Sequence, residues 1–282
     1  MKAIVTLVVG KGYEHNFARY CWSNWKSYAD RHGIELIVYD KLLDNSKRAL
    51  SRSAAWQKCL ALCDERVRKF EQVVWIDSDI VINSAKSPNV FEGVSPEEIG
   101  AVPDYAFPSV KAYLQRLEYF YRQWDLAGVR YVRNLTPQEF LTNWGLPAQD
   151  HVVQTGVLVM NPISHEALLK RTYEQYEDKG DPSWNYEMRP LSYEIIKSGL
   201  IRWLDMRFNV PTIFGVKESD LAFFQIRPPL LERLLKKAGL DIILPIERNR
   251  KIRAIHKEML EESYFLHFAG RSADMRFLGA SH

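Results

Sequence analysis

The sequence has 282 residues, of which 46% are hydrophobic and 26% are charged, a composition typical of a packed globular protein. Lys and Arg number 38 against 35 Asp and Glu, and the net charge of +3 gives no indication of a nucleic-acid-binding protein. Three cysteines without the spacing of a disulfide framework favour a reducing compartment, and no apolar segment has the length of a signal peptide or a membrane span. We therefore expect a cytoplasmic protein that folds without disulfides.

The first 104 residues alternate between apolar runs and amphipathic segments. Continuous apolar runs, typical of strands buried on both faces, predict strands at 3–9, 34–39, 73–77 and 99–103. The segments between them predict a helix over 14–32, which Gly33 ends, and a helix from Ser51 or Ser53 to about residue 70. Alternation in this order predicts an α/β fold with a mainly parallel, doubly wound central sheet.

Beyond Asp104 the pattern is richer in helices and in aromatic residues. Helices are predicted at 108–124, from about 137, and at 164–177, 187–198 and 228–262, and strands at 156–161, 202–204 and 264–268. Pro245 predicts a break in the last helix. Because the sequence has neither an internal repeat nor a low-complexity linker, we expect one domain over residues 1–282. The basic residues between 227 and 253 are typical of a solvated face, with peripheral contact to an anionic membrane surface or an acidic acceptor as the alternative.

An acidic cluster, Asp77-Ser78-Asp79, directly follows the apolar run 73–76 and precedes a second apolar run at 80–82. In α/β sheets, ligands gather at the carboxyl ends of the strands. Two carboxylates in an apolar setting repel each other and lose hydration, and a bound divalent cation removes both penalties. Mg²⁺ and Mn²⁺ take one or two carboxylates and complete their coordination with substrate phosphates. The cluster therefore predicts a divalent metal site, with a surface turn in which Asp79 caps a neighbouring segment as the alternative.

The same cluster also fits a second chemistry. Asp77 to Val81 match the hydrophobic-Asp-x-Asp-x-Thr/Val motif of haloacid-dehalogenase-like phosphatases, in which the first aspartate is a nucleophile. In those enzymes the motif lies on the first strand, whereas here it follows the third predicted strand. The required downstream lysine and acid are represented only by Lys217, Glu218 and Asp220, at unfavourable spacing. A phosphatase that uses Asp77 and Asp79 remains the alternative function.

Four ordered segments carry a resemblance to a known family. They are Arg52–Lys58 (RSAAWQK), Trp75–Ile80 (WIDSDI), Gln154–Pro162 (QTGVLVMNP) and Tyr264–Gly270 (YFLHFAG). In order and spacing, over about residues 3–275, the chain resembles nucleotide-sugar glycosyltransferases of the GT-A (Rossmann-like) fold. The likeness is strongest to family 34, the galactosyl, xylosyl and mannosyl transferases, and weaker to family 8.

The resemblance implies a function, a cofactor and a division of the chain. It implies transfer of a hexose or pentose from a UDP-sugar, favoured over a GDP-sugar, to a hydroxyl of a glycan, glycolipid, small molecule or protein, with retention at the anomeric carbon. It implies Mn²⁺ or Mg²⁺ held by Asp77, Asp79 and His267, an imidazole being an acceptable ligand for Mn²⁺. Residues 1–104 would form the nucleotide-binding half, and residues 105–282 the acceptor half with the segment that closes the metal site.

The resemblance also assigns individual residues to the donor. It implies contacts with the nucleotide, its phosphates or its sugar from the first strand, the helix before the acidic cluster, the cluster itself and the C-terminal loop, at Thr6, Val8, Arg52, Lys58, Asp77, Ser78, Gly270 and Arg271. It implies catalytic positions close to the reacting sugar for Asp104, Gln154 and Glu187. The chain departs from the family in two places. Ser272 and Ala273 stand where relatives have a phosphate-binding lysine, for which Arg271 or Arg276 would substitute, and Glu187-Met188 replaces an Asp-Gln pair.

Overall fold

The computed structural model describes residues 1–180, 186–224 and 243–279, with backbone alone for 243–246. Within these residues, a six-stranded sheet has the strand order β2-β1-β3-β6-β5-β7, and a three-stranded sheet has the order β4-β9-β8. The strands are β1 (Lys2–Leu7), β2 (Glu35–Tyr39), β3 (Gln72–Ile76), β4 (Ile80–Ile82), β5 (Ile99–Pro103), β6 (Val153–Met160), β7 (Ile201–Trp203), β8 (Val210–Pro211) and β9 (Phe265–His267).

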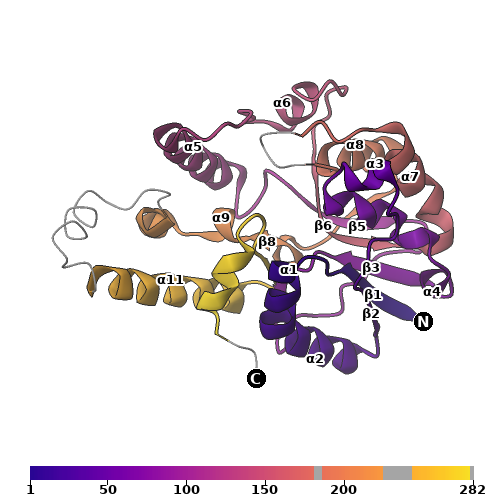
Figure 1. Ribbon diagram of the computed structural model, residues 1–282, viewed down its shortest axis with the longest axis horizontal. Helices are drawn as coiled ribbons and strands as arrows, with labels where there is room; N and C mark the ends of the chain where they lie inside the picture. Colours follow the sequence, from indigo (N-terminus) through magenta and orange to yellow (C-terminus); the bar gives the residue numbers. More distant parts are fainter. Residues whose placement is uncertain (181–185, 225–242, 280–282) are drawn as a thin grey trace.

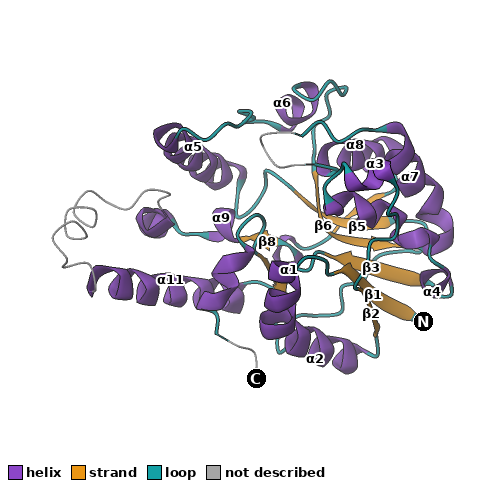
Figure 2. Ribbon diagram, in the orientation of Figure 1, coloured by secondary structure: helices purple, strands orange, loops and turns teal. Residues whose placement is uncertain are grey.

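The α-helices are α1 (Lys11–Asn16), α2 (Trp22–His32), α3 (Lys47–Leu50), α4 (Glu65–Arg68), α5 (Val110–Ala127), α6 (Pro137–Thr142), α7 (Pro162–Gln175), α8 (Met188–Ser198), α9 (Thr212–Gly215) and α11 (Ile243–Glu262). Helices α2 on one side and α7 and α8 on the other flank the larger sheet, and α5, α9 and α11 lie beside it, as Figures 1 and 2 show. A π-helical turn η1 (Phe17–Cys21) joins α1 to α2, and 3-10 helices are η2 (Ala54–Cys63), η3 (Met206–Phe208), η4 (Glu218–Phe224) and η5 (Ser272–Phe277).

The central sheet is mixed but mainly parallel, as the sequence predicts. β1 pairs in parallel with β2 and β3, and β5 pairs in parallel with β7. β6 is antiparallel to both of its neighbours, β3 and β5. Because β6 runs the other way, its first residues, rather than its last, lie at the edge where β3 ends.

Helices cover both faces of this sheet because successive strand residues point to opposite sides. On one face, Ile4 of β1 and Val74 of β3 join a hydrophobic core with Trp25 of α2. On the other face, Val5 and Trp75 join a second core with residues of η2, α7 and α8. This two-sided burial explains the continuous apolar runs in the sequence and confirms the α/β fold class.

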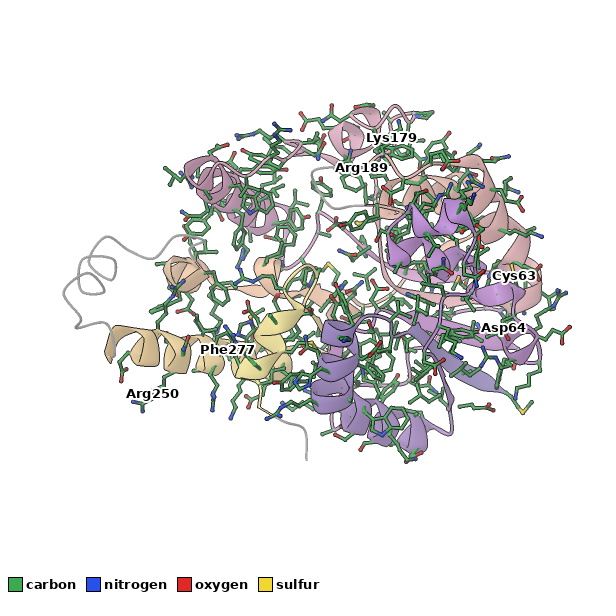
Figure 3. The ribbon with its side chains drawn as sticks, viewed as in Figure 1. Cys63, Asp64, Lys179, Arg189, Arg250 and Phe277 are labelled. Atoms are coloured by element: carbon green, nitrogen blue, oxygen red, sulfur yellow. The ribbon has the colours of Figure 1, made fainter. Side chains whose placement is uncertain are left out.

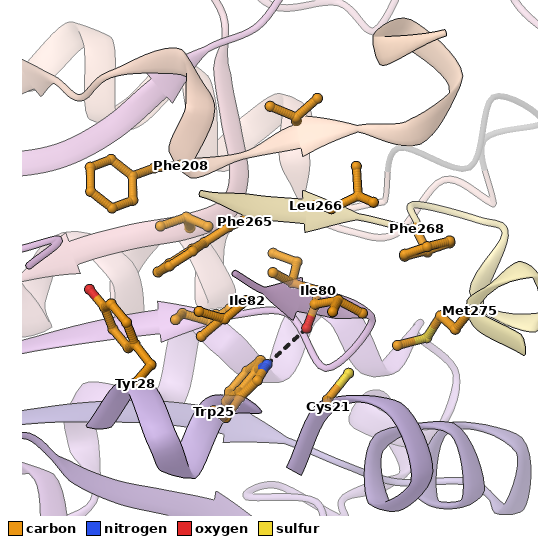
Figure 4. Close-up of a cluster of buried hydrophobic side chains, with 14 of the residues drawn as sticks. Cys21, Trp25, Tyr28, Ile80, Ile82, Phe208, Phe265, Leu266, Phe268 and Met275 are labelled. Carbon is orange, nitrogen blue, oxygen red and sulfur yellow. Dashed lines mark hydrogen bonds between the residues drawn. The ribbon is translucent and has the colours of Figure 1, made fainter. Parts of the chain in front are cut away.

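The smaller sheet brings the C-terminal part of the chain beside the acidic cluster. β9 pairs antiparallel with β4 and parallel with β8. Figure 4 shows the apolar packing around these strands, with Trp25 of α2 donating from its indole Nε1 to the carbonyl of Ile80 at 2.8 Å. Phe265 is fully buried in the same core. The side chains that hold β9 in place are therefore hydrophobic residues drawn from both ends of the chain.

Some predicted elements differ from those observed. The helix predicted at 14–32 is divided by the π-helical turn, and the helix predicted to reach residue 70 is a 3-10 helix followed by α4. Asp64 separates these last two, because it adopts an extended conformation and its side chain accepts from the N–H of Arg66 as a new helix cap. Pro245 lies in the first turn of α11 and does not break it, because a proline there removes no helical hydrogen bond. The predicted start of that helix, 228–242, lies outside the described residues.

No helix in the described ranges is both long enough and apolar enough to cross a lipid bilayer.

Candidate functional site

The acidic cluster lies at the carboxyl end of β3, where the two sheets meet. The N–H of Asp77 donates to the carbonyl of Gly156 on β6 at 2.9 Å, and the chain then turns directly into β4. The register of β4 with β9 sets Ile80 opposite His267. One ligand atom from each of Asp77, Asp79 and His267 lies within 4.8 Å of the others. Three residues that are separated by up to 190 positions therefore converge on one point.

The imidazole of His267 is oriented by Asn209, a residue that the sequence did not single out. His267 Nδ1 lies 2.9 Å from Asn209 Oδ1, and Asn209 Nδ2 donates to the carbonyl of Gln154 at 3.4 Å. With its amide nitrogen engaged, Asn209 presents its oxygen to the imidazole, so Nδ1–H donates. Nε2 is then an acceptor 3.3 Å from Asp79 Oδ1. Two acceptors at this distance repel each other unless a cation or a proton lies between them.

Gly156 provides the space that the imidazole occupies. A Cβ at this position would lie 2.7 Å from Cε1 and 2.9 Å from Nδ1 of His267, closer than side chains tolerate, and would make a tight contact of 3.1 Å with Nδ2 of Asn209. Gly156 belongs to one of the four resembling segments, although no role was assigned to it. Asn209 lies 58 positions from His267, in a turn after η3, and no sequence pattern marks it.

Lys58 reaches the acidic cluster from η2 and is 2% exposed. Its Nζ lies 3.0 Å from Asp77 Oδ1 and 2.8 Å from Glu187 Oε1, and it donates to the carbonyl of Thr155 at 3.2 Å. The hydroxyl of Thr155 donates to Glu187 Oε1 at 3.1 Å. The indole of Trp75 donates to Asp77 Oδ1 at 2.7 Å. One ammonium group thus joins a proposed metal ligand to the carboxylate of Glu187.

The charges of these groups are mutually supporting. Burial alone would raise the pKa of Asp77, but the ammonium of Lys58 and the imidazole of His267 outweigh it and hold that pKa below its usual range. Burial opposes protonation of Lys58, but the carboxylates of Asp77 and Glu187 outweigh it and raise its pKa. The carboxylate of Asp79 likewise raises the pKa of His267 against the effect of burial. The site is therefore a charged network that lies within a largely apolar surrounding.

A cleft of about 270 Å³ opens over this network. It is lined by residues from α1, the carboxyl ends of β1 and β3 and the turns after them, the first half of η2, the first residues of β6, the start of α8, and β9 with the loop after it. They are Leu7, Val9, Tyr13, Ser53, Ala54, Ala55, Lys58, Trp75, Asp77, Ser78, Asp79, Gln154, Thr155, Tyr186, Glu187, Met188, His267, Ala269 and Gly270. Three of these lining residues carry carboxylates and one is a lysine. Without a bound cation the cleft is net negative and would repel a diphosphate.

Six of the sequence-predicted donor or catalytic residues line the cleft, and five do not. Those in the lining are Lys58, Asp77, Ser78, Gln154, Glu187 and Gly270, and those outside it are Thr6, Val8, Arg52, Asp104 and Arg271. Thr6 is fully buried, and Val8 packs in the core with α2. Because successive residues at the end of β1 and just after it point to opposite faces, Leu7 and Val9 reach the cleft instead.

The charged side chains outside the lining have partners of their own. Arg271 Nε donates to Asp274 at 2.7 Å, and its guanidinium lies 5.4 Å from the ring centroid of Phe224. Asp104, at the end of β5, is half-buried and accepts from the hydroxyl of Tyr113 at 3.1 Å. Burial raises the pKa of Asp104 to about 6. Arg52 faces the segment after α7 and is described below.

The residues considered for a phosphatase site lie elsewhere. Lys217 pairs with Glu258 of α11 at 2.5 Å, and Asp220 pairs with Lys251 of α11 at 3.6 Å. The lysine that does lie beside Asp77 is Lys58, which precedes the motif instead of following it.

The basic stretch 227–253 is described only from residue 243 onward. There, Arg250 points away from the body of the protein (Figure 3) and pairs with Glu247 at 4.0 Å. That the basic residues between 227 and 253 form a solvated face stays a prediction.

Comparisons with known proteins place the fold. No family model matches the chain, and a search of curated proteins found no relative. Among solved structures, the chain is similar to a glycosyltransferase involved in the glycosylation of the major capsid of PBCV-1, with a TM-score of 0.50 and 13% identity over 98% of this chain and 100% of that one.

Two further structures are similar over most of the chain. One is an active-site mutant of LgtC, with a TM-score of 0.45 and 13% identity over 96% of this chain and 88% of that one. The other is mouse xyloside xylosyltransferase 1, with a TM-score of 0.38 and 10% identity over 75% of this chain and 87% of that one. With its mainly parallel sheet flanked by helices, and its full-length similarity to the first of these structures, the chain has the GT-A fold of glycosyltransferases.

Proposed function

We propose that this protein is a metal-dependent glycosyltransferase that moves a sugar from a nucleoside diphosphate donor to an acceptor hydroxyl. The observation that carries the proposal is the convergence of Asp77, Asp79 and His267 in a cleft that is net negative. The negative charge disfavours a diphosphate, and a bound cation would offset that repulsion. The GT-A fold supports the assignment. Asp77 follows β3 directly, and Asp79 and His267 meet it there from the start of β4 and the end of β9, at the edge where α/β sheets bind ligands.

The three residues fit a divalent ion such as Mn²⁺ or Mg²⁺. Their ligand atoms lie within 4.8 Å of one another, close to the span of about 4.2 Å between opposite ligands of an ion that binds oxygen at about 2.1 Å. Two carboxylates and an imidazole suit Mn²⁺ in particular. Because Nδ1–H of His267 donates to Asn209, Nε2 carries the free lone pair, and this atom faces Asp79. A metal-binding histidine commonly has one ring nitrogen hydrogen-bonded and the other directed at the metal in this way.

Some side chains of the cleft would bind the donor, and others hold these binding groups in position. Lys58 and Thr155 hold the carboxylate of Glu187 in one orientation, where it and Gln154 are available to hydroxyls of the donor sugar. Gly270, at a φ of +66°, lets the backbone approach the diphosphate without a side chain in the way. A bound divalent ion would supply the positive charge that the leaving diphosphate requires.

The nucleotide side of the cleft favours a UDP-sugar over a GDP-sugar. Leu7, Val9 and Tyr13 give it a largely apolar surface beside the small residues Ala54 and Ala55. Guanine would bring ring N–H and amino donors that carboxylates bind well. The carboxylates that line the cleft are those of the metal site and Glu187, and all of these have other partners. Retention at the anomeric carbon, and a hexose or pentose as the transferred group, rest on the resemblance to family 34.

Calorimetric titration tests the proposal directly. We expect UDP to bind the protein in the presence of Mn²⁺ and to bind weakly or not at all without it. Asp79→Asn and His267→Ala should each abolish the metal-dependent binding, whereas His151→Ala, at an exposed histidine outside the cleft, should leave it unchanged. A protein that binds neither UDP nor GDP with any divalent ion, or one that releases phosphate from a small phosphoester and tolerates His267→Ala, would refute the proposal.

A further inference from the structure

Arg52 lies outside the cleft, but its environment is highly specific. The side chain is 1% exposed, and the guanidinium lies between two rings, 4.7 Å from the centroid of Trp56 and 4.9 Å from that of Tyr173. Its Nη1 donates to the carbonyl of Tyr173 at 2.8 Å, and its Nη2 pairs with Glu177 at 2.7 Å. A stacked guanidinium with bonds in its own plane has a single favourable orientation. Arg52 therefore joins the chain before η2 to the chain after α7.

Asp178 makes a second connection between the same two segments. Its Oδ2 accepts from the N–H of Ser53 at 2.9 Å and from the indole N–H of Trp56 at 3.1 Å. The next residue is fixed as well, because Lys179 Nζ donates to the carbonyl of Trp144 at 2.6 Å beside α6, where Figure 3 labels it. Two successive carboxylates after α7 thus bind the chain at η2. Glu177 pairs with Arg52, and Asp178 accepts from the N–H groups of Ser53 and Trp56.

The residues that these contacts hold form part of the cleft. Ser53, Ala54 and Ala55 all line it, and Lys58 lies one turn further along η2. Side chains as small as these have few atoms with which to fix the backbone by packing. The position of this wall therefore depends on what Arg52 and Asp178 bind.

We propose that Arg52, Glu177 and Asp178 form a clamp that positions the wall Ser53–Ala55 against the donor nucleotide. This inference rests on the proposed function and adds to it three residues that do not contact the substrate. Arg52 thereby changes from an expected donor contact to a positioning residue.

The experiment compares variants on the two sides of the clamp. Asp178→Ala removes the acceptor for Ser53 and Trp56 while leaving Arg52 stacked. Arg68→Ala is the matched control, because Arg68 pairs with Glu166 of α7 at 3.1 Å and neither residue belongs to the clamp or to the wall. Arg52→Ala is a second test, although it leaves a gap between two aromatic rings and can lower stability more generally.

Two measurements report on the clamp separately. In Asp178→Ala we expect hydrogen exchange at the amide of Ser53 to become faster, and the dissociation constant of UDP measured with Mn²⁺ to rise about tenfold or more. The dissociation constant of Mn²⁺ alone should change by less than about twofold, because its ligands lie on other elements. Arg68→Ala should match the unaltered protein in all three quantities.

The outcomes distinguish the clamp from the proposed function. Exchange at Ser53 and UDP affinity that stay as in the unaltered protein would overturn the clamp. So would a parallel loss of Mn²⁺ binding, UDP binding and melting temperature, since that pattern indicates general destabilisation. If the unaltered protein binds no UDP with Mn²⁺, the proposed function is wrong, and the exchange rate of Ser53 still decides whether Asp178 holds the wall.

Discussion

Replacing Lys58 with methionine tests the central charged network. The substitution keeps the length of the side chain and removes its charge. Glu187, whose side chain is 4% exposed, would lose the ammonium group that lies 2.8 Å from its Oε1 and keep the hydroxyl of Thr155. Asp77 would keep the indole N–H of Trp75 and is better hydrated, with 26% of its side chain exposed. Most of the cost therefore arises at Glu187.

The expected cost follows from this burial. Removing one partner of a buried ion pair leaves an uncompensated charge and typically costs about 3–5 kcal/mol. Lys26→Met makes the same chemical change in an exposed pair with Asp30, where the side chains are 58% and 64% exposed. That control should cost no more than about 0.5 kcal/mol. The double variant Lys58→Met with Glu187→Gln removes both charges, and we expect it to recover more than half of the loss.

Urea denaturation of the three variants, followed by tryptophan fluorescence, measures these free energies of unfolding. The reasoning is refuted if Lys58→Met costs no more than Lys26→Met. It is also refuted if adding Glu187→Gln deepens the loss, since the buried carboxylate would then not be the source of the cost.

Two further substitutions test neighbouring features. Gly156→Ala should displace the imidazole of His267 and raise the dissociation constant of Mn²⁺, measured by titration, by about tenfold or more. Gly12→Ala adds a methyl group in open space and should leave that dissociation constant unchanged. Equal Mn²⁺ affinities in the two variants would contradict the prediction. Asp104 has a pKa raised from 3.8 to about 6 by burial, so its contribution to stability is full at low pH and is lost as the pH rises through about 6. Asp104→Asn can still accept from the hydroxyl of Tyr113, so it should stabilise the protein by up to about 3 kcal/mol at about pH 8 and have little effect at about pH 4. Thermal denaturation at both pH values measures this change in stability. The same change at both pH values would contradict the prediction.

The sequence predicted most of the fold because the sheet is buried on both faces. The apolar runs that form β1, β2, β3 and β5 admit few other interpretations, and glycine ends α2 as expected, with Gly33 in the left-handed conformation. The sequence did not predict the three-stranded sheet β4-β9-β8, because it depends on pairing between residues more than 180 positions apart. The other pieces that it did not predict are local. The π-helical turn before α2 and the 3-10 geometry of η2 depend on what packs against them, and a single sequence carries little signal for either.

The site, like the fold, contains residues that the sequence indicated and residues that it did not. Asp77 and Asp79 were predictable from their place after a buried strand, and His267 from the resemblance. Asn209 was not, because an asparagine in a turn after a 3-10 helix has no periodic or spacing signal. The resemblance assigned Arg52 to the donor, and no pattern in the sequence indicated that Glu177 and Asp178, more than 120 positions later, would bind its side chain and the N–H of Ser53.

The position of His267 also explains how the two ends of the chain depend on each other. β4 begins directly after Asp79, and its pairing with β9 is what places the imidazole next to that carboxylate. β9 is held in turn by Trp25, Tyr28 and the other apolar residues around β4 (Figure 4). A metal ion that binds all three ligands binds only a chain in which β9 has docked, and it therefore stabilises this docked state by mass action. The site is then complete only when the N-terminal half and the C-terminal segment have folded together.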